Sequence, residues 1–374
     1  MVFLIVSHVQ HKRNAQGIIG GYGPYVREMN IWLKHFDKVI VVAPVTNCEY
    51  DAIDLPYQHD NIEFVQVPAF EFTSFLQALR STVILPFIMW RIIFAMRRAD
   101  HIHLRCPGNM GLLGCVSQIF FPNKKKTAKY AGNWDWNSQQ PRTYRWQQKI
   151  LQSTRLTKNM TALVYGNWEG ATKNIKSFFT ASYRKDEIVP TKVRDLDGVI
   201  KLIFIGGLNS GKRPLVSIQT AEQLVTRGHE VELFMLGDGK ERNELIEYVK
   251  QHNLSSCVHL LGNVNAEEVK DYASKAHFLI FASKSEGWPK AVAESMFWGC
   301  LPITTNVSCV AEMLGFGERG NLVSPDASEI ADAIEYYLNN SHEYHEKAQA
   351  AMDWSRQYTL ERFEDEVSKL LKDE

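Results

Sequence analysis

The sequence lacks the patterns that mark a disulfide-bonded, metal-binding or membrane-spanning protein. Its six cysteines form no Cys-x-x-Cys pair and no spacing typical of metal ligands, so we expect reduced, mostly buried thiols in a cytoplasmic protein. No Asp-x-Asp motif occurs in the context of a metal site. The longest apolar stretch, residues 82–96, is interrupted by Pro86 and Arg91, and it falls short of the roughly 20 residues that span a bilayer.

The N-terminus also lacks the features of a signal peptide. The apolar residues 1–6 are followed at once by the polar Ser7 and His8, and no basic region precedes them. We therefore expect a cytoplasmic protein that is not integral to a membrane.

What the sequence does contain is two successive α/β patterns. A chain of 374 residues exceeds the roughly 250–300 at which one core stops growing, so we expect two domains. Short apolar runs alternate with amphipathic stretches, which is typical of parallel sheets covered by helices. Strands are predicted at 2–6, 39–43, 62–67, 101–104, 127–131 and 162–165 in the first half, and at 199–205, 231–236, 258–261, 278–282 and 301–304 in the second.

The boundary between the halves is predicted in residues 186–198, which carry Pro190, Gly198 and several charges with little apolar periodicity. The chain ends in an amphipathic helical pattern that either packs back on the first domain or caps the second. The expected parts are a first domain at 1–190, a second at 199–355 and a terminal helix at 356–374.

The clearest chemical pattern is a pair of glutamates, Glu286 and Glu294, placed eight positions apart around a predicted turn. The run 277–282 before them is typical of a buried strand, and Pro289 suits the first position of a helix because it has no N–H to leave unpaired. Free N–H groups at a helix start bind phosphate, and flanking carboxylates can accept hydrogen bonds from sugar hydroxyls. The pattern favours a nucleotide-sugar pocket over two solvated glutamates.

This segment resembles the E-x7-E signature of glycosyltransferase family four (group 1). That family is retaining and metal-independent, and its GT-B architecture has two Rossmann-like α/β domains whose parallel sheets face a central cleft. The following runs G-C-L-P-I and V-A-E recur in the family's order, and the likeness is most specific from Gly206 to Glu312. The resemblance implies that Glu294 holds the ribose hydroxyls and Glu286 the sugar hydroxyls.

The resemblance also implies which residues meet the donor phosphates. Family members usually read F-x-G-R-L and then K-G, where this chain has I-F-I-G-G-L-N-S-G-K-R-P. Lys212 matches the lysine, Gly207 stands where the arginine is expected, and Arg213 replaces the next glycine. Lysine is a point charge, whereas arginine binds two phosphate oxygens with its fork, so we expect Arg213 to compensate in part. The other donor-side candidates are Gly21, Gly237, Gly239, Gly262, Gly287, Trp288, Pro289 and Lys290.

Gly21 belongs to a glycine-rich segment after the first strand. There Gly20, Gly21 and Gly23 are expected to permit close backbone approach and positive φ before a helix begins near Pro24. The spacing is not G-x-G-x-x-G, so a dinucleotide dehydrogenase is poorly supported. The family resemblance places this turn beside the donor phosphates.

Two strand ends in the first half carry the acceptor-side candidates. Asn133, Trp134 and Asp135 stand where many family members have a histidine. Asp135 is expected to accept a proton or a sugar hydroxyl, and Trp134 either stacks on a sugar face or anchors the core. Arg105 is expected to meet an acceptor phosphate or to pair with Asp135, while His8 is interpreted as a loop histidine.

The sequence therefore predicts a retaining, metal-independent hexosyltransferase. It would move a hexose from a nucleotide diphosphate sugar to a glycan or lipid-linked acceptor in surface polysaccharide biosynthesis, with no cofactor and no nucleic-acid partner. Glu286, Lys212 and Asp135 are the catalytic candidates. The alternatives are a non-catalytic sugar-nucleotide-binding subunit, a nucleotide-sugar epimerase of the same architecture and, more distantly, a Rossmann oxidoreductase.

Positive charge is concentrated in the first half. Residues 1–195 hold 25 Lys and Arg against 14 Asp and Glu, and the remainder holds 17 against 28. The stretch 80–158 has only Asp100 and Asp135 as acids, and such a basic field attracts anionic membrane surfaces. Residues 82–96 within it either lie in the membrane interface or form a buried helix, and both readings place the protein at the inner face of a membrane. The apolar residues concerned include Phe87, Trp90, Ile92, Ile93 and Phe94.

Overall fold

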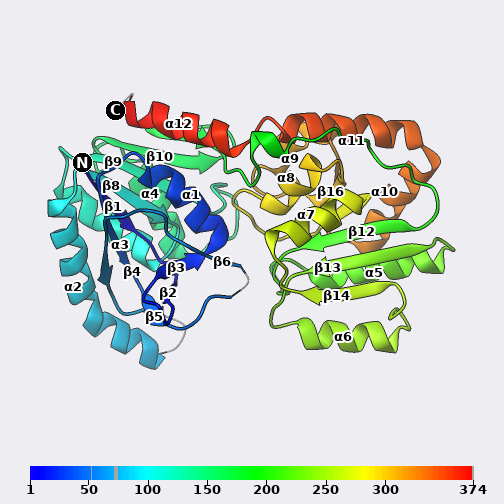
Figure 1. Ribbon diagram of the computed structural model, residues 1–374, viewed down its shortest axis with the longest axis horizontal. Coiled ribbons are helices and arrows are strands. Elements are labelled where there is room, and N and C mark those ends of the chain that lie inside the picture. The colour runs from blue at the N-terminus through cyan, green and yellow to red at the C-terminus, as the bar shows by residue number, and fades with distance from the viewer. Residues whose placement is uncertain (52, 71–74, 373–374) are drawn as a thin grey trace. The chain divides into compact units, whose positions relative to one another are not determined.

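The computed structural model describes residues 1–51, 53–70 and 75–372, and the chain divides into two compact units. Unit 1 comprises residues 1–179 together with the segment from Phe363 to the C-terminus, and unit 2 comprises residues 180–362. Each unit is built around a parallel β-sheet with helices packed on it (Figure 1). The predicted α/β class with two Rossmann-like domains is therefore confirmed.

Unit 1 has a seven-stranded parallel sheet in the order β11-β10-β9-β8-β1-β4-β7. Its strands are β1 Val2–Val6, β4 Lys38–Ala43, β7 Ile62–Gln66, β8 His101–Cys106, β9 Lys125–Tyr130, β10 Met160–Tyr165 and β11 Ile175–Phe178. The helices of this unit are α1 Gly23–Leu33, α2 Phe75–Arg98, α3 Asn109–Ser117 and α4 Arg142–Gln152, with a short 3-10 turn at Gln118–Phe120.

A smaller four-stranded sheet, β5-β2-β3-β6, accompanies the large one. Its strands are β2 His11–Arg13, β3 Ile19–Tyr22, β5 Val45–Asn47 and β6 Asp54–Pro56. Gly20 and Gly21 lie in β3, where a Cβ on Gly20 would come within 2.3 Å of the carbonyl oxygen of Leu55. Close backbone approach is thus present, but the expected positive φ was wrong, because these glycines make room for a neighbouring strand and do not form a turn.

Unit 2 has a six-stranded parallel sheet in the order β14-β13-β12-β15-β16-β17. Its strands are β12 Ile200–Ile205, β13 Val231–Leu236, β14 Val258–Gly262, β15 Phe278–Phe281, β16 Leu301–Thr305 and β17 Asn321–Val323. The helices are α5 Pro214–Thr226, α6 Arg242–Gln251, α7 Ala266–Lys275, α8 Lys290–Phe297, α9 Val310–Met313, α10 Ala327–Asn339 and α11 Ser341–Ser355, with 3-10 turns at Lys185–Glu187 and Gly315–Gly317.

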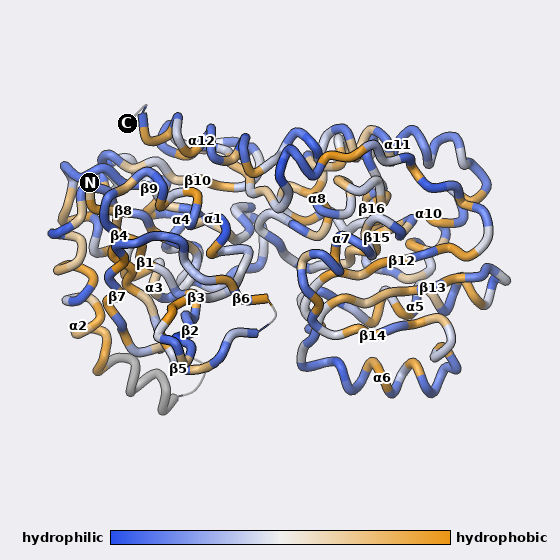
Figure 2. The backbone as a smooth tube through the Cα atoms, viewed as in Figure 1, coloured by the Kyte–Doolittle hydropathy of each residue, from blue (hydrophilic) through white to orange (hydrophobic). Residues whose placement is uncertain are grey.

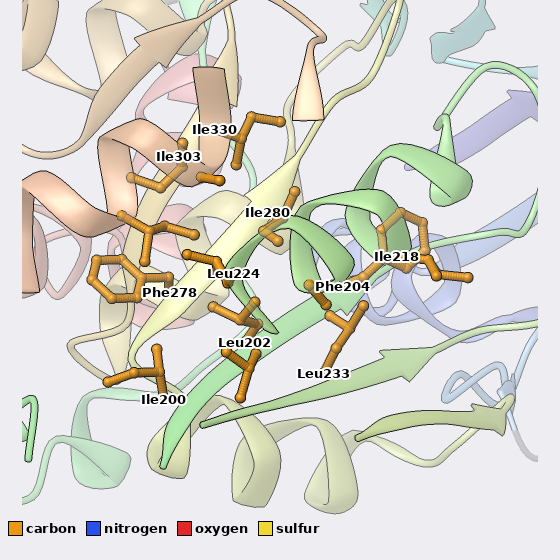
Figure 3. Close-up of a cluster of buried hydrophobic side chains, with 14 of the residues drawn as sticks. Ile200, Leu202, Phe204, Ile218, Leu224, Leu233, Phe278, Ile280, Ile303 and Ile330 are labelled. Carbon is orange, nitrogen blue, oxygen red and sulfur yellow. The ribbon is translucent and has the colours of Figure 1, made fainter. Parts of the chain in front are cut away.

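The central strands of unit 2 are apolar along most of their length (Figure 2). This is the pattern of parallel strands that are covered on both faces. Phe204 of β12 and Ile280 of β15 are at most 3% exposed, and they pack against Ile218 of α5 and Ile330 of α10 (Figure 3). The strands at the centre of the sheet are therefore held firmly, and the loops that follow them start from fixed points.

The segment 186–198, where the sequence suggested a linker, lies inside unit 2. Val193 and Leu196 pack against the core of that unit. Arg194 donates hydrogen bonds from Nη1 to the carbonyl oxygens of Ser274 (2.7 Å) and Trp298 (2.9 Å). This segment is polar because it lies at the surface, yet its alternate side chains anchor it, so it is not a free connection.

The last helix, α12 Leu360–Lys372, contributes residues to unit 1 from Phe363 onward. The Phe363 ring is 1% exposed and meets the edge of the Phe178 ring, with 5.5 Å between centroids. Glu364 accepts a hydrogen bond from Lys34 Nζ at 2.9 Å. The apolar stripe of the helix is thus covered by unit 1, while the domain limits drawn from the sequence stay predictions.

Two further expectations concern the chain as a whole. The six cysteines are free thiols, and Cys106, Cys115, Cys300 and Cys309 are buried. Within the residues that the structure describes, no helix has the length and apolar character needed to cross a bilayer.

Candidate functional site

The order in which successive strands are added to the sheet of unit 2 reverses between β12 and β15. The first strand of this sheet is β12. β13 and β14 lie on one side of it, and β15 lies on the other side. In open parallel sheets, ligands bind outside the carboxyl ends of the two strands at such a switch point. Residues 206–213 follow β12 and residues 282–289 follow β15. Both donor-side segments singled out in the sequence therefore emerge at this edge.

Lys212 and Glu286 meet at the switch point. The Lys212 ammonium donates a hydrogen bond to the Glu286 carboxylate, in an ion pair whose side chains are 28% and 11% exposed. The Lys212 Nζ atom also lies 5.5 Å from the centre of the Phe281 ring. Two candidates that are 74 residues apart in the chain are thus brought into direct contact, on one side of the loop that precedes α8.

Arg213 joins the same two loops by a different contact. It has left-handed backbone angles at the start of α5 (φ 51°), and its Nη1 donates to the carbonyl oxygen of Ala282 at 2.9 Å. The N–H of Lys284 donates to the carbonyl oxygen of Gly211 at 2.8 Å. In this arrangement the Arg213 guanidinium braces the loops, so a role as a phosphate fork stays a prediction.

The loop that carries Glu286 is held by one residue at the end of β16 and one shortly after it. Thr305 Oγ1 donates to the carbonyl oxygen of Ser283 (2.7 Å), and Ser308 Oγ donates to that of Gly287 (2.9 Å). No sequence motif marked these two hydroxyl groups, and only the neighbouring position of β15 and β16 could have revealed them. Within the described residues, the backbone N–H groups of residues 285–287 donate to no protein acceptor.

The helix after this loop begins one residue later than expected. Pro289 is the cap residue of α8, and its carbonyl oxygen accepts the hydrogen bond of the Val292 N–H at 3.0 Å. Lys290 is the first helical residue. The free N–H groups of a helix start and of the preceding loop together form a partial positive charge. This is the part of the site suited to an anion.

Glu294 lies within α8 and has different partners from Glu286. Its Oε1 accepts a hydrogen bond from Ser182 Oγ at 2.5 Å. Glu294 and Trp288 line a narrow crevice together with Tyr358, and the Trp288 and Tyr358 ring centroids are 5.7 Å apart. The two glutamates of the motif are thus held by separate sets of contacts, which allows them to have separate roles.

The candidate glycines at the other strand ends allow backbones to approach. Gly237 has a φ of 140°, and a Cβ there would lie 2.0 Å from the carbonyl oxygen of Gly206. A Cβ on Gly239 would lie 2.3 Å from the carbonyl oxygen of Leu208, and the Gly237 N–H donates to the Gly262 carbonyl at 2.8 Å. These packing roles account for the glycines, while contact with a nucleotide base stays a prediction.

Gly207 is the position where an arginine was expected. A Cβ at this residue would lie 3.0 Å from the Asn209 side-chain nitrogen. A longer side chain here requires the end of the Asn209 side chain to shift.

In unit 1, Arg105 forms a buried ion pair with Glu28 of α1. The Nη1–Oε1 and Nη2–Oε2 distances are 2.7 and 3.4 Å, and the two side chains are 10% and 4% exposed. Burial is the largest single influence and would lower the pKa of Arg105, but the charge and hydrogen bond of Glu28, together with the nearby Tyr165 and Tyr25, outweigh it and the pKa is raised. The expected alternative of a pair with Asp135 was wrong, because Arg105 points toward α1. Contact with an acceptor stays a prediction.

The segment after β9 forms a tight turn. The Asn133 side-chain oxygen accepts the Asp135 N–H, and Asp135 Oδ1 accepts the Asn137 N–H, both at 2.9 Å. Trp134 is fully buried and meets the Tyr130 ring edge-on, with 4.9 Å between centroids. A stacking role for Trp134 on a sugar is thus wrong, and the core-anchor reading is correct. The catalytic role of Asp135 stays untested.

Unit 1 has its own switch point, between β1 and β8, and His8 lies there. His8 follows β1 and Gly108 follows β8. A Cβ on Gly108 would lie 2.7 Å from His8 Nδ1. Packing around the ring, and then the charge of Arg105, lowers the pKa of His8. His8 lies between β1 and β2, so the interpretation as a loop histidine agrees with its position.

Across the described ranges, no group of three or more His, Cys, Asp or Glu side chains is arranged to hold a metal ion. The groups suited to an anion at the unit 2 edge are instead the Lys212 ammonium and the N–H groups before α8.

Comparison with known proteins identifies the family of this site. Residues 188–354 match the family described as Glycosyl transferases group 1. Unit 2 therefore belongs to that family, and the resemblance noted in the sequence is confirmed.

Whole-chain matches to solved structures have the GT-B fold. HepE of Anabaena, in complex with UDP-glucose, is 13% identical with a TM-score of 0.72 and full coverage of both chains. Sucrose-phosphate synthase of Thermosynechococcus elongatus is 15% identical with a TM-score of 0.69, over 100% of this chain and 98% of that one.

Curated relatives match over a shorter range. A Campylobacter jejuni protein is 29% identical over 177 residues, covering 44% of this chain and 47% of its own length. It is named N-acetylgalactosamine-N,N'-diacetylbacillosaminyl-diphospho-undecaprenol 4-alpha-N-acetylgalactosaminyltransferase. The 2-deoxystreptamine N-acetyl-D-glucosaminyltransferase of Niallia circulans is 26% identical, over 39% of this chain and 38% of its own. The chain thus spans less than half the length of these relatives.

Proposed function

We propose that the protein is a glycosyltransferase that moves a hexose from a nucleotide diphosphate sugar to an acceptor hydroxyl. The observation that carries this proposal is the meeting of Lys212 and Glu286 at the switch point of a group 1 domain. A cation for the diphosphate and a carboxylate for the sugar stand side by side, next to the start of α8. HepE was solved with UDP-glucose, which supports a donor of this chemical class.

The proposed reaction proceeds with retention of configuration and without a metal ion. The acceptor hydroxyl attacks the anomeric carbon on the face from which the diphosphate departs, the bond from the anomeric carbon to the diphosphate oxygen breaks, and the hydroxyl proton passes to that diphosphate. Negative charge builds on the leaving group before the proton arrives. Lys212 and the N–H groups of residues 285–287 would stabilise this charge as it develops. Glu286, released from Lys212 when the diphosphate binds, would accept hydroxyls of the sugar, and Glu294 would hold the ribose.

The proposed acceptor is a glycan or a lipid-linked glycan used for a surface polysaccharide. The Campylobacter jejuni relative is named for a diphospho-undecaprenol-linked acceptor, which supports this class. Such an acceptor would be met at the cytoplasmic face of a membrane.

The test is release of nucleoside diphosphate from a panel of donor sugars, with glycan and polyprenyl-diphosphate-linked acceptors. We expect wild-type turnover with at least one pair. Lys212→Met should lose about two to three orders of magnitude in turnover, because one well-placed donor to the leaving group is removed. The matched control is Lys275→Met, which changes an exposed lysine of α7 and should leave turnover unchanged. Equal turnover of the two variants would refute the assignment.

A binding subunit without transferase activity is the second candidate. It is favoured by Gly207, which stands where an arginine was expected to bind the donor phosphates. Calorimetric titration with nucleoside diphosphates and their sugars separates the two. Tight donor binding with no diphosphate release for any acceptor would support the subunit and exclude the enzyme.

A further inference from the structure

Helix α2 exposes a row of large apolar side chains on its outer face. Its inner face is conventional: Ile88, Ile92 and Met96 are fully buried in the core of unit 1. The outer face is not, because Val83, Phe87, Trp90 and Phe94 are 75%, 46%, 59% and 53% exposed. We call these four residues the aromatic stripe. In Figure 2, the coloured part of α2 carries many apolar residues at the edge of unit 1.

The spacing of the stripe follows the helix. Its members are separated by four, three and four positions, which places them within about 40° of one line along the helix surface. Neighbouring rings touch, with centroids 6.4 Å apart for Phe87 and Trp90 and 5.9 Å for Trp90 and Phe94. Scattered exposed apolar residues are normal, but a contiguous row of this kind marks a contact surface.

Cations lie at the end of the stripe. Arg97 continues the same line one turn further, is exposed, and forms no ion pair with any described residue. Lys124 donates from Nζ to the Arg97 carbonyl oxygen at 2.9 Å, which places it and the exposed Lys125 beside the C-terminus of α2. The acidic group nearest in sequence, Asp100, accepts the Val2 N–H at 2.7 Å.

We propose that the aromatic stripe, with Arg97, Lys124 and Lys125, is a face that binds an anionic lipid bilayer. Aromatic rings on a helix with basic residues at its edge suit the headgroup region, where rings enter the acyl boundary and cations meet lipid phosphates. Binding to a membrane would bring the protein close to the proposed lipid-linked acceptor. The membrane proposal itself is argued only from the exposed face of α2. It also decides between the two readings of residues 82–96. Ile92 belongs to the core, and the aromatic stripe belongs to the membrane.

The test is co-sedimentation of the full chain with phosphatidylcholine vesicles, with and without phosphatidylglycerol. We expect binding to the anionic vesicles, weaker at high salt, and none to the neutral ones. Trp90→Ala should weaken binding about tenfold, as expected for loss of a large apolar contact. Its control is Trp146→Ala, which removes a tryptophan of α4 that is 56% exposed and should bind as wild type does.

Charge is tested in the same assay. Arg97→Glu should weaken binding to the anionic vesicles and make the remaining binding less dependent on salt, because a cation that meets lipid phosphates is lost, whereas Lys275→Glu, an equal charge change on unit 2, should do neither. No binding at low salt, or wild-type binding by Trp90→Ala, would overturn the proposal. So would a lipid-free dimer that Trp90→Ala dissociates in analytical ultracentrifugation, because the stripe would then belong to a second copy.

Donor binding separates this proposal from the proposed function. Trp90→Ala should bind a nucleoside diphosphate as wild type does, because the aromatic stripe contains none of the donor-side residues. Vesicle binding by a protein that turns over no donor sugar would refute the transferase and leave the membrane face standing. Turnover of a donor sugar without vesicle binding would refute the membrane face and support the transferase.

Discussion

Replacing Glu28 with leucine should destabilise unit 1 strongly. The change leaves Arg105 charged in a site where its side chain is 10% exposed. Removing one partner of a buried ion pair costs about 3–5 kcal/mol. A unit of this size shifts by about 2–4 °C for each kcal/mol, so we expect the melting temperature of unit 1 to fall by about 6–20 °C.

Differential scanning calorimetry of single and double variants gives the measurement. Glu28→Leu combined with Arg105→Leu should cost less than the sum of the two single changes, because no unpaired charge is then buried. Glu364→Gln is the control, because its ion pair with Lys34 is exposed and should contribute less than about 1 kcal/mol. A loss below about 1 kcal/mol for Glu28→Leu, or additive costs in the double variant, would refute the reasoning.

Three other outcomes are expected. Burial lowers the pKa of His11, His101 and His277 to about 4. The unfolded chain therefore binds more protons than the folded one between pH 6.5 and 4, and each histidine should lower the free energy of unfolding by about 2 kcal/mol at pH 5. An unchanged urea midpoint between pH 7.5 and pH 5 would contradict this. Glu294→Gln should weaken donor binding measured by calorimetry, whereas Glu286→Gln should mainly lower turnover. The reason is that Glu286 contacts Lys212, while Glu294 accepts a hydrogen bond from Ser182. Near-wild-type kinetics in both variants would refute the separate roles of the two glutamates. Transfer measured by diphosphate release should survive excess EDTA, and loss that magnesium or manganese restores would show a metal requirement.

Most strands of the two large sheets could be predicted because buried parallel strands tend to be apolar runs, but the edge strands β11 and β17 were missed. Every expected strand is present, with its ends within two residues of the prediction. The small sheet could not be found in this way. Its strand β2, for example, is the three-residue segment His11–Arg13, whose residues are mostly polar. It is defined by pairing with segments elsewhere in the chain, and no local period records such pairing.

The candidate site was predictable in its parts but not in its contacts. The motif identified Glu286 and the lysine position identified Lys212, yet their meeting depends on β15 lying beside β12. For Trp134, the sequence identified the residue but could not decide its role. A tryptophan at a strand end suits both a sugar platform and a core, and only its complete burial decides between them.

Helix α2 explains why composition alone left the membrane question open. Residues 82–96 are apolar on nearly every side, so hydrophobicity does not reveal which face the sheet covers. Once Ile88 and Ile92 are known to face the core, helical geometry requires Phe87, Trp90 and Phe94 to face outward. A helix that only covers a core has apolar residues on its inner face and polar residues on its outer face. The outer aromatic rings nevertheless remain 46–59% exposed, and this is why we propose a contact outside the chain for them.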